Sequence, residues 1–157
     1  MEGEVTLIRA GAGDAERLWQ MQTEAFSGLL AKYQDFETSP GNEPLQKVRQ
    51  RLAQDETYFY FICADGQKVG AIRVVDSGCA GMPKRISPLF ILEKYRGKGF
   101  AQKAILACEA MHGAEHWALD TILQEEGNCR LYEKMGYRAT GETRRINSAM
   151  TLVYYEK

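Results

Sequence analysis

The hydrophobic positions of this chain follow two spacings, every second residue as in strands and every third or fourth as in helices. A first strand is predicted at residues 4–9 and is followed by an amphipathic helix. We expect that helix to end near Ser27 and Gly28, because glycine commonly ends helices. Prolines then interrupt residues 29–44, which we expect to be irregular, before a second helix at residues 45–52.

The middle of the chain predicts a hairpin followed by a third strand. Two apolar runs, residues 58–63 and 69–75, flank an Asp-Gly pair typical of a tight turn. The next strand, residues 84–92, contains Pro88, which cannot donate to a sheet ladder and therefore indicates a bulge. The remaining predicted elements are a helix at 101–110, a strand at 117–123, a short helix at 128–135, and strands at 137–145 and 150–155.

The most informative local feature is the glycine-containing basic loop at residues 96–99. It follows an apolar strand and leads directly into a helix. Such a loop directs several free backbone N–H groups and the positive end of a helix dipole toward one point. This arrangement suits a phosphate or pyrophosphate. A P-loop would need a different glycine and lysine spacing, and a dinucleotide fingerprint would need a third glycine or alanine in register.

Composition limits the function classes that this loop can serve. A chain of 157 residues matches one domain, residues 1–157, and can bury roughly 68–70% of its unfolded surface. Its 20 basic and 21 acidic side chains give a net charge of -1, which argues against binding to nucleic acid or to an anionic membrane. The four cysteines and two histidines, His112 and His116, lack metal-site spacing, so we expect no metal and structural roles for both histidines. Without a leader or a spanning segment of roughly 20 apolar residues, we expect a cytoplasmic protein.

Two motifs together resemble the GNAT family of acyl-CoA-dependent N-acetyltransferases, and the resemblance covers nearly the whole chain. The family loop Gln/Arg-x-x-Gly-x-Gly/Ala is matched by Arg96, Gly99 and Ala101. The family hallmark Leu-Tyr-Glu-Lys-x-Gly-Phe/Tyr is matched at residues 131–137. The resemblance implies an α/β (α+β) fold: a single mixed, mostly antiparallel seven-stranded sheet flanked by about four helices, in the order β-α-α-β-β-β-α-β-α-β-β.

The resemblance also implies that acetyl-CoA is the cosubstrate. Pyrophosphate contacts are expected from the loop and the start of its helix: Arg96, Gly97, Lys98, Gly99, Phe100 and Ala101. The strand before the loop, at Phe90, Ile91 and Leu92, would pair with the two amides of pantetheine at a strand edge opened by the bulge. A backbone N–H of Ile91 or Leu92 would stabilise the oxyanion.

Tyr132 is the expected proton donor to the departing thiolate, since a phenol and a thiol have similar enough pKa values for proton transfer. Many family members carry an asparagine seven residues before this tyrosine, where this chain has Glu125. Two alternatives stay open. Asn128, four residues before Tyr132, takes over the pantetheine contact, or Glu125 replaces it and acts as general base.

The function implied is transfer of an acetyl group to a primary amine of a small molecule or peptide, by direct attack in a ternary complex. The first helix and the segment after it contain Glu24, Tyr33 and Asp35, an acidic and aromatic set that favours a cationic amine. The alternative is a non-catalytic acyl-CoA-binding module that regulates or senses. Either a monomer or a homodimer fits the sequence.

Overall fold

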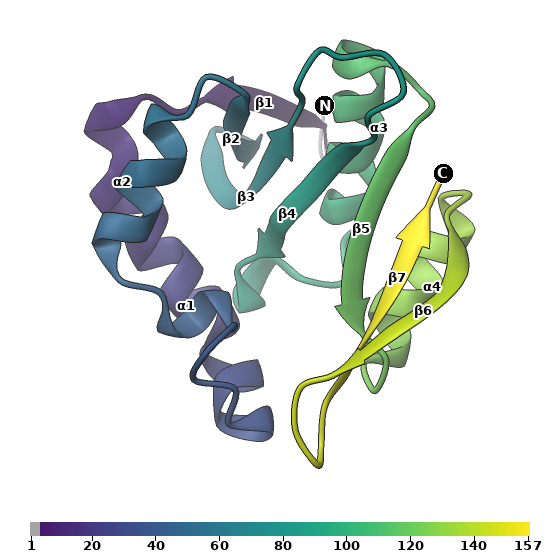
Figure 1. Ribbon diagram of the computed structural model, residues 1–157. Coiled ribbons are helices and arrows are strands. Elements are labelled where there is room, and N and C mark those ends of the chain that lie inside the picture. The colour runs from purple at the N-terminus through teal and green to yellow at the C-terminus, as the bar shows by residue number, and fades with distance from the viewer. Residues whose placement is uncertain (1–3) are drawn as a thin grey trace.

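Seven strands of the computed structural model, which describes residues 4–157, form one sheet in the order β1-β2-β3-β4-β5-β7-β6 (Figure 1). All neighbouring strands are antiparallel except β4 and β5, which are parallel. The predicted fold class and element order are therefore confirmed. The strands are β1 Val5–Arg9, β2 Thr57–Ala64, β3 Gln67–Val75, β4 Lys84–Ile91, β5 Trp117–Ile122, β6 Arg138–Arg145 and β7 Thr151–Glu156.

Helices cover both faces of this sheet (Figure 1). α1 and α2 pack on one face around Leu18, Val48 and Phe61, and α3 packs on the other face around Ile72 and Ile105. α4 contributes Tyr132 to that second cluster. The helices are α1 Ala15–Tyr33, α2 Leu45–Ala53, α3 Phe100–His112 and α4 Glu126–Lys134, with short 3-10 turns at Ala12–Asp14, Pro40–Asn42 and Glu93–Tyr95.

The predicted end of the first helix is wrong. α1 continues past Gly28 to Tyr33, and Gln34 then adopts a left-handed conformation with φ 57°. Nothing lies within 4 Å of a Cβ placed on Gly28, so this glycine is on an open face of the helix and does not end it. The half-buried Leu29 and the buried Tyr33 hold the last turns in place, an instance of tertiary packing overriding local propensity.

A bulge and a split in the sheet both involve β4. Ile72 of β3 pairs with Leu89 and Val74 pairs with Ile86, so two steps along β3 match three steps along β4. The predicted bulge at Pro88 is thereby confirmed. β4 pairs with β5 only at Lys84 and Arg85 among the described residues, and the two strands diverge beyond that point (Figure 1). The β5-facing edge of β4 is left open.

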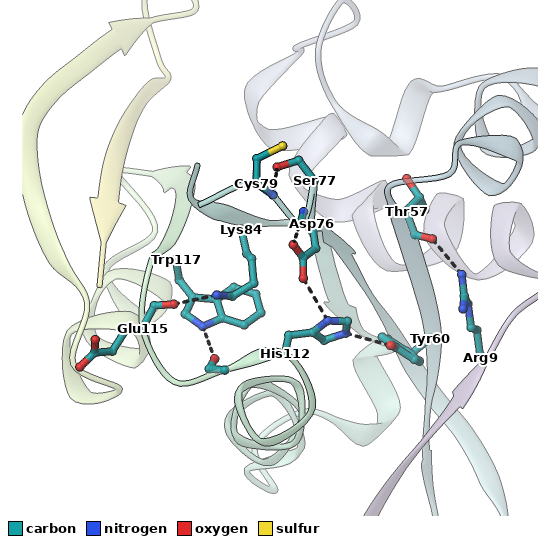
Figure 2. Close-up of polar contacts among 12 residues, drawn as sticks. Arg9, Thr57, Tyr60, Asp76, Ser77, Cys79, Lys84, His112, Glu115 and Trp117 are labelled. Carbon is teal, nitrogen blue, oxygen red and sulfur yellow. Dashed lines mark hydrogen bonds and ion pairs between the residues drawn. The ribbon is translucent and has the colours of Figure 1, made fainter. Parts of the chain in front are cut away.

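A half-buried polar cluster lies at the end of the sheet where β4 and β5 are still paired. His112, the last residue of α3, contacts Asp76 through Nδ1 (3.5 Å) and the Tyr60 hydroxyl through Nε2 (2.9 Å) (Figure 2). The Tyr58 ring packs edge-on against the imidazole with centroids 4.9 Å apart. These contacts join α3 to β2 and to the residue after β3, which is a structural role for His112.

Candidate active site

The glycine loop presents unpaired backbone donors at the start of α3. Gly97 and Gly99 both have positive φ, +80° and +79°, which disfavours other residues, and nothing lies within 4 Å of a Cβ placed on either. Within the described residues, Lys103 is the first in α3 whose N–H bonds to a backbone carbonyl, that of Gly99 (3.1 Å). The N–H groups before it have no helical acceptor. The space in front of the loop is therefore open and lined by donors, which fits an anion.

Arg96 contacts two backbone carbonyls within the fold. Its Nε donates to the Ile91 carbonyl (2.8 Å) and one Nη donates to the Ala25 carbonyl (2.7 Å). The side chain thereby ties the loop to β4 and α1. Lys98 is exposed at the loop surface, where its charge can act on a bound anion.

Only part of the predicted β4 segment faces the split. The Leu92 N–H donates to the Val69 carbonyl (2.8 Å), so the expectation that it could serve an oxyanion is wrong. The Phe90 carbonyl also points toward β3, since it would lie 2.1 Å from a Cβ on Gly70. Backbone groups alternate in direction along a strand, so Ile91 directs its N–H toward the open edge.

A cavity of about 330 Å³ lies at this split. It is lined from one face of the sheet by α1 residues such as Phe26 and from the other by Tyr132 of α4. The predicted residues Tyr33, Asp35 and Asn128 line it as well. Glu24 is exposed on α1 and is not part of the lining, so the structure does not bring it to the others.

Tyr132 is buried where the cavity meets the core. Its ring packs against those of Tyr137 and Tyr155, with centroids 6.0 and 6.3 Å apart. Burial raises the pKa of the Tyr132 hydroxyl, and the charge of Asp120 raises it further. The phenol is therefore protonated at neutral pH and holds a proton to donate.

Glu125 is held by two donors from the end of α1. Lys32 Nζ lies 2.7 Å from its Oε2, and the Tyr33 hydroxyl donates to the same oxygen (2.5 Å). These hydrogen bonds, that of Lys32 first, lower the pKa of the Glu125 carboxyl and make it a weaker base. Since Asn128 lines the cavity and Glu125 does not, this geometry favours the alternative in which Asn128 meets the ligand.

Sequence analysis missed Asp120, a carboxylate of β5 that lines the cavity. Trp117 and Leu119 are buried in the core, and strand alternation turns Asp120 to the opposite face. Its Oδ2 lies 3.2 Å from Nη2 of Arg85. Burial raises the pKa of this carboxyl, while the charges of Arg85 and Arg144 oppose the rise. The sequence signal that could have identified Asp120 is a single acidic residue on the face of a predicted strand opposite its apolar residues.

Residues 4–157 offer neither a metal cluster nor a membrane-spanning helix. This part of the chain contains no group of three or more His, Cys, Asp or Glu side chains placed to hold a metal ion. Its helices include none that is long and apolar enough to cross a membrane.

Comparison with known proteins agrees with this geometry. The family model described as an acetyltransferase (GNAT) domain matches residues 29–157. The SPbeta prophage-derived uncharacterized N-acetyltransferase YokL of Bacillus subtilis (strain 168) is 31% identical over 113 residues. That alignment covers 67% of this chain and 61% of YokL, so the match spans about three fifths of that relative.

Solved structures share the fold at low sequence identity. An acetyltransferase from Thermus thermophilus superposes with a TM-score of 0.72 at 16% identity, over 99% of this chain and 97% of its own. A spermidine N-acetyltransferase from Vibrio cholerae, in complex with CoA and spermine, gives a TM-score of 0.74 at 15% identity, over 98% and 95%. With a family model that matches most of its length, the chain belongs to the GNAT family of acetyltransferases.

Proposed function

We propose that this protein transfers an acetyl group from acetyl-CoA to a primary amine of a small molecule or peptide. The observation that carries the proposal is the open edge of β4 running directly into a loop of unpaired N–H groups. An extended edge suits the peptide-like pantetheine arm, and the loop suits its pyrophosphate. Structural relatives of this fold include enzymes solved with acetyl-CoA or CoA.

Acetyl-CoA supplies the acetyl group as a thioester. The open edge of β4 holds the pantetheine arm at the split, and the N–H groups of residues 97–101 hold the pyrophosphate, with Lys98 adding charge. Asn128, which lines the cavity on the first turn of α4, contacts the same arm. Arg96 supports these contacts by fixing the loop against β4 and α1.

Chemistry in the cavity requires a base, an oxyanion donor and an acid. Asp120 accepts the proton of the attacking amine, because its carboxylate lines the cavity and has the raised pKa that a base needs. The Ile91 N–H, two residues beyond the lining residue Leu89 on β4, stabilises negative charge on the thioester oxygen. The Tyr132 hydroxyl gives its proton to the sulfur as the carbon–sulfur bond breaks, so the products are an amide and free CoA.

Direct attack by the amine is favoured over a covalent acetyl-enzyme. Cys129 is the cysteine nearest in sequence to Tyr132, but its thiol points to the Ile122 carbonyl (3.7 Å) and does not line the cavity. A thiol must be deprotonated to attack a thioester, and both histidines of the chain lie well away in sequence from Cys129.

A binding and turnover experiment tests this function. Acetyl-CoA at about 100 times its dissociation constant should stabilise the fold by about 2.7 kcal/mol and raise the melting temperature. When amines from a panel are mixed one at a time with the protein and acetyl-CoA, free CoA should be released only with an amine that serves as the acceptor. Stabilisation without turnover would instead indicate the non-catalytic acyl-CoA-binding module. No stabilisation at millimolar acetyl-CoA would refute both functions.

A pair of glycine variants gives the matched control. Gly99 and Gly66 have nearly the same φ, +79° and +78°, and an open space around a Cβ. Gly99→Val and Gly66→Val therefore impose the same backbone strain, one at the loop and one at the β2–β3 turn. We expect only Gly99→Val to lose the stabilisation by acetyl-CoA.

A further inference from the structure

Contacts from the end of α1 bound the acceptor side of the cavity. Tyr33, which lines the cavity, donates its hydroxyl to Glu125 before α4 (2.5 Å). The carbonyl of Tyr33 accepts from Asn147 Nδ2 in the β6–β7 connection (2.8 Å). Lys32 adds an ion pair to Glu125 (2.7 Å). Three separate segments therefore meet at this wall.

Charges of both signs line this cavity. Asp35 and Asp120 supply carboxylates, and Arg144 of β6 supplies a guanidinium. Asp35 is buried and already accepts from the N–H (3.0 Å) and the hydroxyl of Thr38, so part of its capacity is used within its own turn. Asp120 is paired through one oxygen with Arg85. The cavity thus has less unpaired negative charge for a ligand than the acidic sequence around Tyr33 indicates.

Arg144 is a solvent-exposed residue of β6 that also lines this cavity. Over residues 4–157, no hydrogen bond and no ion pair within 4.0 Å involves its guanidinium, although its charge acts on Asp120. A guanidinium presents several donors in a planar fork that matches a carboxylate or a phosphate. An anionic group on the acceptor would give Arg144 a partner. Asp120, which lines the same cavity, would then lie near the amine of that acceptor.

We propose, on the basis of the function proposed above, that the acceptor is a small amphoteric molecule that carries a carboxylate or phosphate as well as its primary amine. Arg144 binds the anionic group, and Asp120 faces the amine. A polyamine, which carries positive charge only, leaves Arg144 unpaired and places like charges together. An internal lysine of a peptide has no free carboxylate for Arg144, because its α-carboxyl group is part of a peptide bond.

Matched acceptor pairs test this proposal. L-lysine and cadaverine differ by one carboxylate, and phosphoethanolamine and ethanolamine differ by one phosphate. We expect kcat/KM to favour the anionic member by at least about tenfold in one of the pairs, the scale of a charge-assisted contact. Which pair responds distinguishes a carboxylate from a phosphate. The same compounds are also tested for stabilisation of the CoA-loaded protein, which needs no turnover.

Variants of β6 assign the effect to its residue. Arg144→Ala should remove the preference within the responding pair, and Arg144→Glu should reverse it. Arg138→Ala, which removes an exposed arginine at the other end of the same strand, should change neither. Loss of the preference without loss of turnover on cadaverine or ethanolamine excludes misfolding as the cause.

The proposal is overturned if the uncharged or cationic member of both pairs is preferred or bound equally well. It is also overturned if a peptide with an internal lysine is acetylated better than L-lysine. Turnover of cadaverine with no preference refutes the amphoteric acceptor and supports the acetyltransferase. Absence of turnover with every amine refutes the acetyltransferase, while the stabilisation measurements still decide what the cavity binds.

Discussion

Replacing Asp120 with asparagine removes a negative charge from the cavity but keeps the size of the side chain and an oxygen that can accept from Arg85. We expect kcat to fall by about 10²- to 10⁴-fold, the usual contribution of a positioned base. This corresponds to about 2.7 to 5.5 kcal/mol in activation free energy. Binding of acetyl-CoA should persist, because the loop and the β4 edge provide it through backbone groups of other residues.

The pH dependence gives the sharper readout. Burial raises the pKa of Asp120 above its ordinary value of 3.8, with Arg85 and Arg144 opposing the rise. A base works only when deprotonated, so wild-type activity should fall as the pH drops through this raised pKa. Asp120→Asn should lose the inflection set by this carboxyl, so its residual rate should climb steadily with pH as more of the amine becomes neutral.

The assay is steady-state release of CoA at saturating acetyl-CoA, measured from about pH 5 to about pH 9. Asp65→Asn is the control, since Asp65 is an exposed acid in the β2–β3 turn and asparagine tolerates its positive φ of 52°. If Asp120→Asn retains kcat within about twofold while chemistry limits the rate, or keeps that inflection, Asp120 is not the base.

Three other variants probe the cleft. Tyr132→Phe keeps the ring packing and should lower kcat by about 10²- to 10⁴-fold with acetyl-CoA binding intact; unchanged single-turnover rates would assign Tyr132 to packing. Gly70→Ala places a Cβ 2.1 Å from the Phe90 carbonyl oxygen, so it should cost about 1–3 kcal/mol in urea unfolding and raise KM for acetyl-CoA. Glu125→Gln weakens the contact with Tyr33 and should raise KM for the acceptor more than it lowers kcat. In the wild type, the same rise in KM should appear as the pH falls through the lowered pKa of Glu125.

Local sequence determinants predicted most of the fold. Apolar spacing located the strands and helices, the Asp-Gly turn located the β2–β3 hairpin, and Pro88 located the bulge in β4. Each of these rests on steric or hydrogen-bonding limits of a few adjacent residues. The end of α1 was not predictable in this way, because packing of Leu29 and Tyr33 outweighs the local cost of Gly28.

Side-chain partners across the fold were less accessible to sequence reasoning. The loop motif predicts that Arg96 contacts phosphate. It does not predict the contacts of Arg96 with the Ile91 and Ala25 carbonyls, because these come together only when α1 packs on the sheet. The sequence around Glu125 predicts a loop carboxylate without partners. Its partners Lys32 and Tyr33 lie more than 90 residues away in the chain, so local sequence does not identify them.

By itself, the sequence determined which chemistry this protein has available: a glycine loop at a helix start, an interrupted strand before it and a tyrosine on a short helix after it. These features depend on neighbouring residues, whose geometry is set by local covalent and steric constraints. Only the tertiary structure decided that the Leu92 N–H faces β3, that Asp120 and Arg144 share the cavity with Tyr33, and that the end of α1 bounds it. Such contacts join segments far apart in the chain, and their positions follow from the packing of helices on the sheet and from the divergence of β4 and β5.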